Sequence, residues 1–265
     1  MKKRIFISLF VLSFIFSSWF LIYKVDWISI FQVENISARS ENKIGDVLWD
    51  IYKKTDEEIE DPDVKQTIDS LTTYVCMQNN IDYNKLKIHI VKNKDVNAFA
   101  LPAGHIVINS GLLQNSNNES EFIGVFSHEL SHVELNHVMK KMYKEFGISV
   151  LLSITVGQNS EMIKNILNSL TSTAYDRTLE SEADLNAVKF MEKASIDPKY
   201  LAYFLIKISK SDQNLNLFKW FSTHPDSKFR AHQILKQKKF KKDQQNKIIL
   251  NKNSWNKLKI KLNEM

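Results

Sequence analysis

The hydrophobic positions of this chain recur mostly with the period of an α-helix. Asp61 and Pro62 form a typical helix start, with aspartate as the N-cap and proline at the first helical position. The apolar residues that follow recur every three or four positions, so a helix is predicted to reach Gln78. By the same pattern, further helices are predicted over residues 44–54, 121–146, 147–157, 161–170, 172–193, 198–210 and 225–236.

Two short segments alternate as β-strands do. Residues 86–91 alternate between apolar and polar side chains, and residues 105–109 form a second extended run. The segment between them breaks the alternation with a proline and a glycine. We therefore expect a small antiparallel sheet in a mostly helical α+β fold.

The N-terminus combines a basic start with a long apolar run. Residues 5–23 carry no charge and would span about 28 Å as a helix, close to the thickness of a bilayer core. The run has no small-residue cleavage site at its end. We predict that residues 1–30 form a signal-anchor in the bacterial inner membrane, with an exported domain behind it. A cleaved signal peptide, which would leave a periplasmic protein, is the alternative.

Composition restricts the chemistry that the chain can carry. Cys76 is the one cysteine among 265 residues, which excludes an intramolecular disulfide and a multi-cysteine metal site. The net charge of +6 is concentrated after residue 235, where ten lysines face two acidic residues, 10 − 2 = +8. Residues 236–265 are predicted to be a lysine-rich tail, either solvated or in contact with an anionic surface. The tail has no arginine and lacks the interleaved basic and aromatic residues typical of nucleic-acid binding.

The segment from His128 to His132 carries the first candidate chemistry. Residues four apart project from the same face of a helix, so these two histidines can offer their imidazoles to one metal ion. Glu129 would lie beside that ion, where a general base is needed. His137, five residues after His132, is expected to turn away from this face and to be a structural or surface residue.

A second acidic segment lies downstream of the two histidines. Glu180 and Asp184 are four apart on a predicted helix, so one carboxylate can reach a metal while the other supports a ligand histidine. Arg177 can balance the charge of this array. A surface helix of charge pairs is the alternative for this segment taken by itself.

The chain resembles the gluzincin metallopeptidases, which include HtpX, the periplasmic BepA-like proteases and the CAAX prenyl endopeptidases. Four segments carry the resemblance in the order of the family: NAFALPAGHIVINSGLL from Asn97, HELSHVELNH from His128, RTLESEAD from Arg177 and STHPDSKFRAHQI from Ser222. The resemblance implies a zincin-like metallopeptidase domain over residues 34–235. The chain shows neither the tetratricopeptide repeats of the BepA type nor the several membrane segments of HtpX, so we expect a small anchored protease.

The resemblance also implies roles for single residues. It makes His128, His132 and Glu180 the ligands of one zinc ion, and Glu129 the general base. His224 would lie near the metal, where it stabilises the oxyanion or blocks the site at rest. Arg230 would contact the active-site carboxylates.

A protein substrate is expected to bind in extended form along an edge strand, through backbone hydrogen bonds that demand little sequence specificity. The residues expected in that strand are Ala103, Gly104, His105, Ile106, Val107, Ile108 and Asn109.

The function predicted is the zinc-dependent hydrolysis of internal peptide bonds in envelope or misfolded proteins. One alternative is a non-catalytic, zinc-stabilised envelope chaperone or assembly factor. Another is a protease held latent by His224.

Overall fold

The computed structural model describes residue 16 and residues 38–155, 160–210, 220, 222–237 and 246–265. The chain divides into two compact units, Met1–Ser37 and Ala38–Met265, and the second is described below. The expected membrane or signal segment, residues 1–30, lies outside the described residues except for Phe16. Within the described ranges, no helix has both the length and the apolar character to cross a bilayer.

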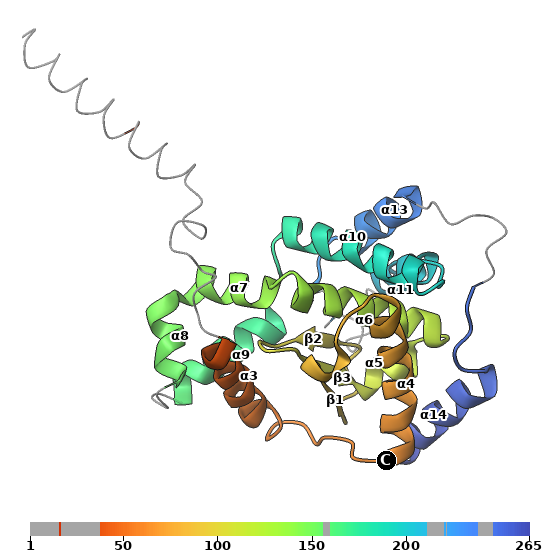
Figure 1. Ribbon diagram of the computed structural model, residues 1–265, viewed down its shortest axis with the longest axis horizontal. Helices are drawn as coiled ribbons and strands as arrows, with labels where there is room; N and C mark the ends of the chain where they lie inside the picture. The colour runs from red at the N-terminus through yellow and green to blue at the C-terminus, as the bar shows by residue number, and fades with distance from the viewer. Residues whose placement is uncertain (1–15, 17–37, 156–159, 211–219, 221, 238–245) are drawn as a thin grey trace, which may run out of the picture. The chain divides into compact units, whose positions relative to one another are not determined.

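The unit Ala38–Met265 is mostly helical and contains one small sheet (Figure 1). Its strands are β1 (Lys87–Val91), β2 (Ala98–Ala100) and β3 (His105–Asn109). Its described α-helices are α3 (Ala38–Tyr52), α4 (Pro62–Gln78), α5 (Ser110–Asn115), α6 (Glu119–Glu134), α7 (His137–Phe146), α8 (Ile148–Thr155), α9 (Ser160–Ser172), α10 (Arg177–Lys193), α11 (Lys199–Ser209), α13 (Ser227–Gln237) and α14 (Lys252–Glu264). A short 3-10 helix, η2, covers Tyr83–Lys85.

Helix α4 begins and ends where the sequence predicts, and the Asp61 carboxylate accepts hydrogen bonds from two backbone amides of its first turn. The single helix predicted over 121–146 is instead two helices. Asn136 adopts a left-handed conformation, with φ of 57°, between α6 and α7. Asparagine tolerates this conformation better than most residues, so the chain can turn there.

The sheet has the order β1-β3-β2, with β1 parallel and β2 antiparallel to β3. The expected antiparallel pairing of the first and last strands is therefore wrong, because the unpredicted strand β2 forms the hairpin with β3. The expected edge strand at 103–109 is also wrong. Strand β3 is central, and Ala103 and Gly104 form the turn before it with φ of 61° and 76°.

Helix α6 lies between the sheet and helices α10 and α11 (Figure 1). Side chains of α6 share one buried apolar core with Ile106 and Ile108 of β3. Gly124 of α6 permits a close approach to α11, since a Cβ atom there would lie 2.9 Å from that of Leu201. This packing places the middle of α6 deep inside the domain.

The C-terminal segment from residue 246 is part of the fold. Trp255, Leu258 and Leu262 of α14 are buried in the common core. The Glu119 carboxylate, at the start of α6, accepts hydrogen bonds from the backbone amides of Ile249 and Leu250, both of 2.6 Å. The expectation of a solvated tail is thus wrong for residues 246–265, because apolar residues at helical spacing lie among its lysines.

Candidate metal centre

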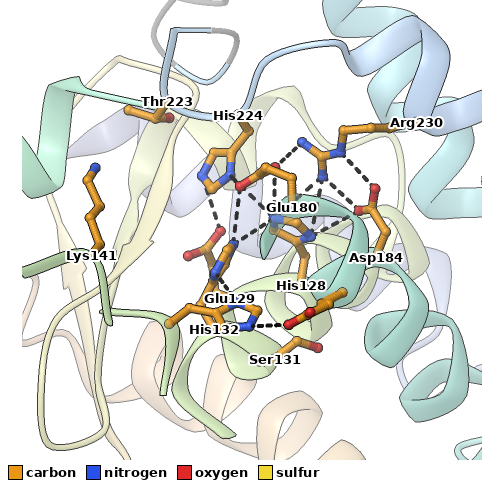
Figure 2. Close-up of polar contacts among 12 residues, drawn as sticks. His128, Glu129, Ser131, His132, Lys141, Glu180, Asp184, Thr223, His224 and Arg230 are labelled. Atoms are coloured by element: carbon orange, nitrogen blue, oxygen red, sulfur yellow. Dashed lines mark hydrogen bonds and ion pairs between the residues drawn. The ribbon is translucent and has the colours of Figure 1, made fainter. Parts of the chain in front are cut away.

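Three elements bring the expected site residues together (Figure 2). His128 and Glu129 lie on one turn of α6 and His132 on the next, and none of the three has exposed surface. Glu180 comes from the first turn of α10, and His224 precedes α13. Because α6 is enclosed on both sides, all five side chains are buried.

The spacing of the side-chain atoms fits a tetrahedral metal site. Each of His128, His132, Glu180 and His224 offers one ligand atom, and these atoms lie within 4.8 Å of one another. A tetrahedral zinc with bonds of about 2.1 Å separates its ligand atoms by about 3.4 Å. His132 Nε2 lies 3.1 Å from His128 Nε2 and 3.4 Å from Glu180 Oε1. Histidines and one carboxylate are also the donors that zinc prefers.

Unsatisfied buried oxygens support the same fit. Neither oxygen of the Glu129 carboxylate has a well-formed hydrogen bond among the described residues, although both are buried. An isolated buried carboxylate is costly, so such groups normally have a cation or ordered water beside them. The residues present therefore fit a zinc ion with a water molecule next to Glu129.

The Asp184 carboxylate contacts His128 on the Nδ1 side of its ring, and Arg230 in turn binds Asp184. The Nδ1 atom of His128 lies 3.1 Å from Asp184, whose two oxygens accept hydrogen bonds of 2.7 Å from Arg230. Burial alone would raise the pKa of Asp184, but the Arg230 guanidinium outweighs it and the pKa is lowered. Arg230 also forms an ion pair with Glu180. The expected contacts of Asp184 and Arg230 are thus present in the structure.

Arg177 lies outside this carboxylate array. Its side chain is 84% exposed, and its Nε atom forms an ion pair of 2.8 Å with Asp226. Arg230 reaches the array from α13 and takes the place that the sequence suggested for Arg177. The expected charge balance by Arg177 is therefore wrong.

His224 completes the group of ligand atoms. Its Nδ1 atom lies 2.9 Å from Glu180 Oε1 and 3.3 Å from His128 Nε2, while Nε2 lies 3.5 Å from Glu129. The Trp220 indole stacks on its ring, with centroids 4.1 Å apart. Burial is the main cause that lowers the pKa of His224, to about 4, so its imidazole is neutral near pH 7. A neutral imidazole in this place can act as a fourth metal ligand.

The sequence missed several residues around the metal group. His137 lies outside the metal group, on the far side of the His132 ring; it is fully buried, and its Nδ1 atom lies 3.0 Å from His132 Nδ1. Tyr175 stacks on the His132 ring at 4.1 Å between centroids, and the Lys141 ammonium lies over the Tyr175 ring. Asn136 could have indicated this turn, because asparagine tolerates the left-handed conformation that brings His137 back to His132. No motif marks Tyr175, Lys141 or Trp220, because tertiary packing alone brings them there.

Strand β3, which was expected to bind substrate, does not border the metal group. His105 of β3 contacts His89, Lys87 and Asp46 on the face of the sheet that α3 covers. Strand β2 lies closer to the chemistry, since the Ala100 amide interacts with the Glu129 carboxylate.

Glu129 has the protonation behaviour of a poised base. Burial raises its pKa to about 8, against the lowering effects of His128 and the Ala100 amide. A bound cation would lower that pKa again and keep the carboxylate ionised. The arrangement can therefore hold a metal and move a proton beside it.

Comparison with known proteins identifies relatives of this arrangement. The family model described as Peptidase family M48 matches residues 58–238. The Beta-barrel assembly-enhancing protease of Yersinia pestis is 25% identical over 222 residues, which cover 75% of this chain and 45% of that protein. Metalloprotease LoiP of Escherichia coli (strain K12) is 29% identical over 172 residues, 62% of this chain and 68% of that protein.

A third relative, metalloprotease YcaL of Escherichia coli (strain K12), is 30% identical over 166 residues, 60% of this chain and 65% of that protein. The chain spans less than half the length of the beta-barrel assembly-enhancing proteases that it matches.

Proposed function

The chain belongs to peptidase family M48, and we propose that it is a zinc-dependent endopeptidase that hydrolyses internal peptide bonds of protein substrates. The observation that carries this proposal is the buried group of His128, His132 and Glu180 with the Glu129 carboxylate beside it. A purely structural zinc site has no use for a buried carboxylate base beside the metal.

Zinc and the side chains would contribute different parts of the hydrolysis. A bound zinc ion would make hydroxide available near pH 7 and polarise the substrate carbonyl. Glu129 takes a proton from the attacking water and passes it to the leaving nitrogen as the C–N bond breaks. Asp184 and Arg230 hold His128 and Glu180 in place during the reaction.

The outer edge of β2 is the proposed docking strand. The Leu101 amide donates to the His105 carbonyl, and the Asn109 amide donates to the Asn97 carbonyl. Alternate residues bond to opposite sides of a strand, so the backbone groups of Ala98 and Ala100 point away from β3. An extended peptide that adds to this edge would run past Glu129.

Degradation of unfolded casein tests the proposal. We expect the wild-type protein to cleave casein, the Glu129→Gln variant to bind zinc without cleaving, and a chelator to abolish cleavage until zinc is restored. Zinc binding with no cleavage by either the wild type or His224→Ala, across a panel of unfolded substrates, would favour the alternative of a non-catalytic chaperone or assembly factor.

A resting state closed by His224 is the second candidate. With His224 as a ligand, the metal would have four protein ligands, whereas catalytic zinc sites keep one position for water. Movement of the His224 side chain out of the metal group would free that coordination position for water. We therefore propose that the described arrangement is latent.

The proposed location is the bacterial cell envelope. The basic start and apolar run of residues 1–30 support an inner-membrane anchor or a secretory signal, and envelope or misfolded proteins would then be the substrates. Lys252 and Lys257 are exposed on α14 and would suit an anionic surface. Cell fractionation with N-terminal sequencing separates an anchored protein from a cleaved, periplasmic one.

A further inference from the structure

The two ring nitrogens of His132 have different surroundings. Nε2 faces the metal group, 3.4 Å from Glu180 Oε1. Nδ1 faces away from it, 3.0 Å from Nδ1 of His137. His137 is the first residue of α7, and the left-handed turn at Asn136 brings it back to the ligand that it follows in sequence.

His137 in turn contacts α10. Its Nε2 atom lies 3.2 Å from Oε2 of Glu182, which lies between Glu180 and Asp184 in the sequence. His137 has no exposed surface, while the side chain of Glu182 is 48% exposed. The contacts therefore form a chain from the buried ligand to the domain surface.

With a metal bound to Nε2 of a neutral His132, one placement of protons satisfies every contact in this chain. A ligand nitrogen must be free of its proton, so metal binding at Nε2 puts the His132 proton on Nδ1. That N–H then donates to His137 Nδ1, which leaves the His137 proton on Nε2. The Nε2–H donates to the Glu182 carboxylate, so each donor meets an acceptor.

We propose that His137 and Glu182 are positioning residues that fix the tautomer and ring orientation of His132 for zinc. The proposal rests on the metal site of the proposed function, and concerns metal affinity rather than the chemical step. Asp184 supports the other ligand, His128, by direct contact. The two histidine ligands thus receive their support from the same helix, one directly and one through a second imidazole.

Zinc affinity measured by competition with a chromogenic chelator tests the proposal. We expect His137→Leu, which fills the space but accepts no hydrogen bond, to weaken zinc binding about 10- to 100-fold. His137→Asn leaves a small cavity but places an oxygen near the position of Nδ1, so it should recover most of that affinity. Glu182→Gln should have a smaller effect, because its carbonyl oxygen can still accept and its side chain is half exposed.

The order of the two His137 variants separates positioning from packing. A packing role predicts that leucine is tolerated and asparagine is harmful, which is the reverse of our expectation. Zinc binding by His137→Leu as tight as wild type, or weaker binding by the asparagine variant than by the leucine variant, would overturn the proposal. His232→Leu, on the exposed side of α13, is the matched control and should bind zinc normally.

One further readout keeps the interpretation clear. Thermal unfolding in excess chelator reports the stability of each metal-free variant, so a folding defect is recognised as such. Casein cleavage is not part of this test. A protein that bound zinc but cleaved nothing, both as wild type and as His224→Ala, would contradict the proposed function and leave the affinity comparison valid.

Discussion

His128 and Asp184 face each other across α6 and α10, with Nδ1 of the imidazole 3.1 Å from the carboxylate. The contact fixes which nitrogen of His128 is presented to a metal. It also explains why Arg230 is buried there, since the guanidinium offsets the charge of Asp184 and Glu180. A ligand, its carboxylate and a cation thus form one unit.

Asp184→Asn should weaken zinc binding about 10- to 100-fold, because the amide accepts the His128 proton less strongly than a carboxylate and leaves Arg230 partly unpaired. Chelator competition measures the change. Asp50→Asn, a substitution on the exposed side of α3, is the control and should leave the affinity unchanged. Equal affinities in Asp184→Asn and wild type would show that this contact does not support the ligand.

His224→Ala should raise the rate of casein cleavage if His224 holds the enzyme latent, since its removal frees a coordination position for water. The measurement is the initial rate at saturating zinc, with His232→Ala as the control. A decrease of about 100-fold or more would instead assign His224 to stabilisation of the oxyanion.

The contribution of His105 to the stability of the metal-free protein should fall as the pH falls below 6.5. Burial, with repulsion from Lys87 and His89, lowers the pKa of His105 from 6.5 to about 4, although Asp46 opposes this shift. Between these values the unfolded chain binds a proton that the folded chain excludes. The free energy of unfolding should therefore decrease by about 1 kcal/mol per pH unit from this group, and level off below pH 4.

Urea unfolding at several pH values in the presence of a chelator checks this prediction. His105→Gln removes the titrating group and should give a shallower dependence on pH. His89 is hydrogen-bonded to His105 through Nε2, and its Nδ1 atom lies 2.9 Å from the Glu58 carboxylate. The same slope in wild type and variant would assign the acid sensitivity to other groups.

Trp255→Ala should reduce the free energy of unfolding by about 3–5 kcal/mol, the usual cost of removing a buried tryptophan. The indole of Trp255 is 2% exposed, and its ring lies 6.1 Å from that of Phe122 in α6. Ile260→Ala on the exposed side of the same helix should cost less than about 0.5 kcal/mol. Similar urea midpoints for the two variants would mean that α14 contributes little to the fold.

The sequence predicts much of the candidate site because the proposed ligands depend on local spacing. The four-residue separation of His128 and His132, like that of Glu180 and Asp184, sets their direction as soon as a helix forms. The family resemblance adds His224 and Arg230, which no local rule could place.

The features that the sequence did not predict depend on contacts between distant segments. Strand β2 has three residues, too few to show a period, and pairing with β3 alone defines it. Trp220 and Tyr175 reach the site by packing against its histidines. In α14, the apolar positions have helical spacing, but the surrounding lysines obscured that signal.

The hydrogen bonds from Ile249 and Leu250 to Glu119 have a consequence for biogenesis. Synthesis proceeds from the N-terminus, so α6 leaves the ribosome long before Ile249 and Leu250, whose amides bond to its first residue. A nascent chain therefore has the histidines of α6 without their full support. The domain can therefore reach its complete packing only after residues 246–265 have been synthesised, which delays the maturation of the candidate metal centre until that segment is available.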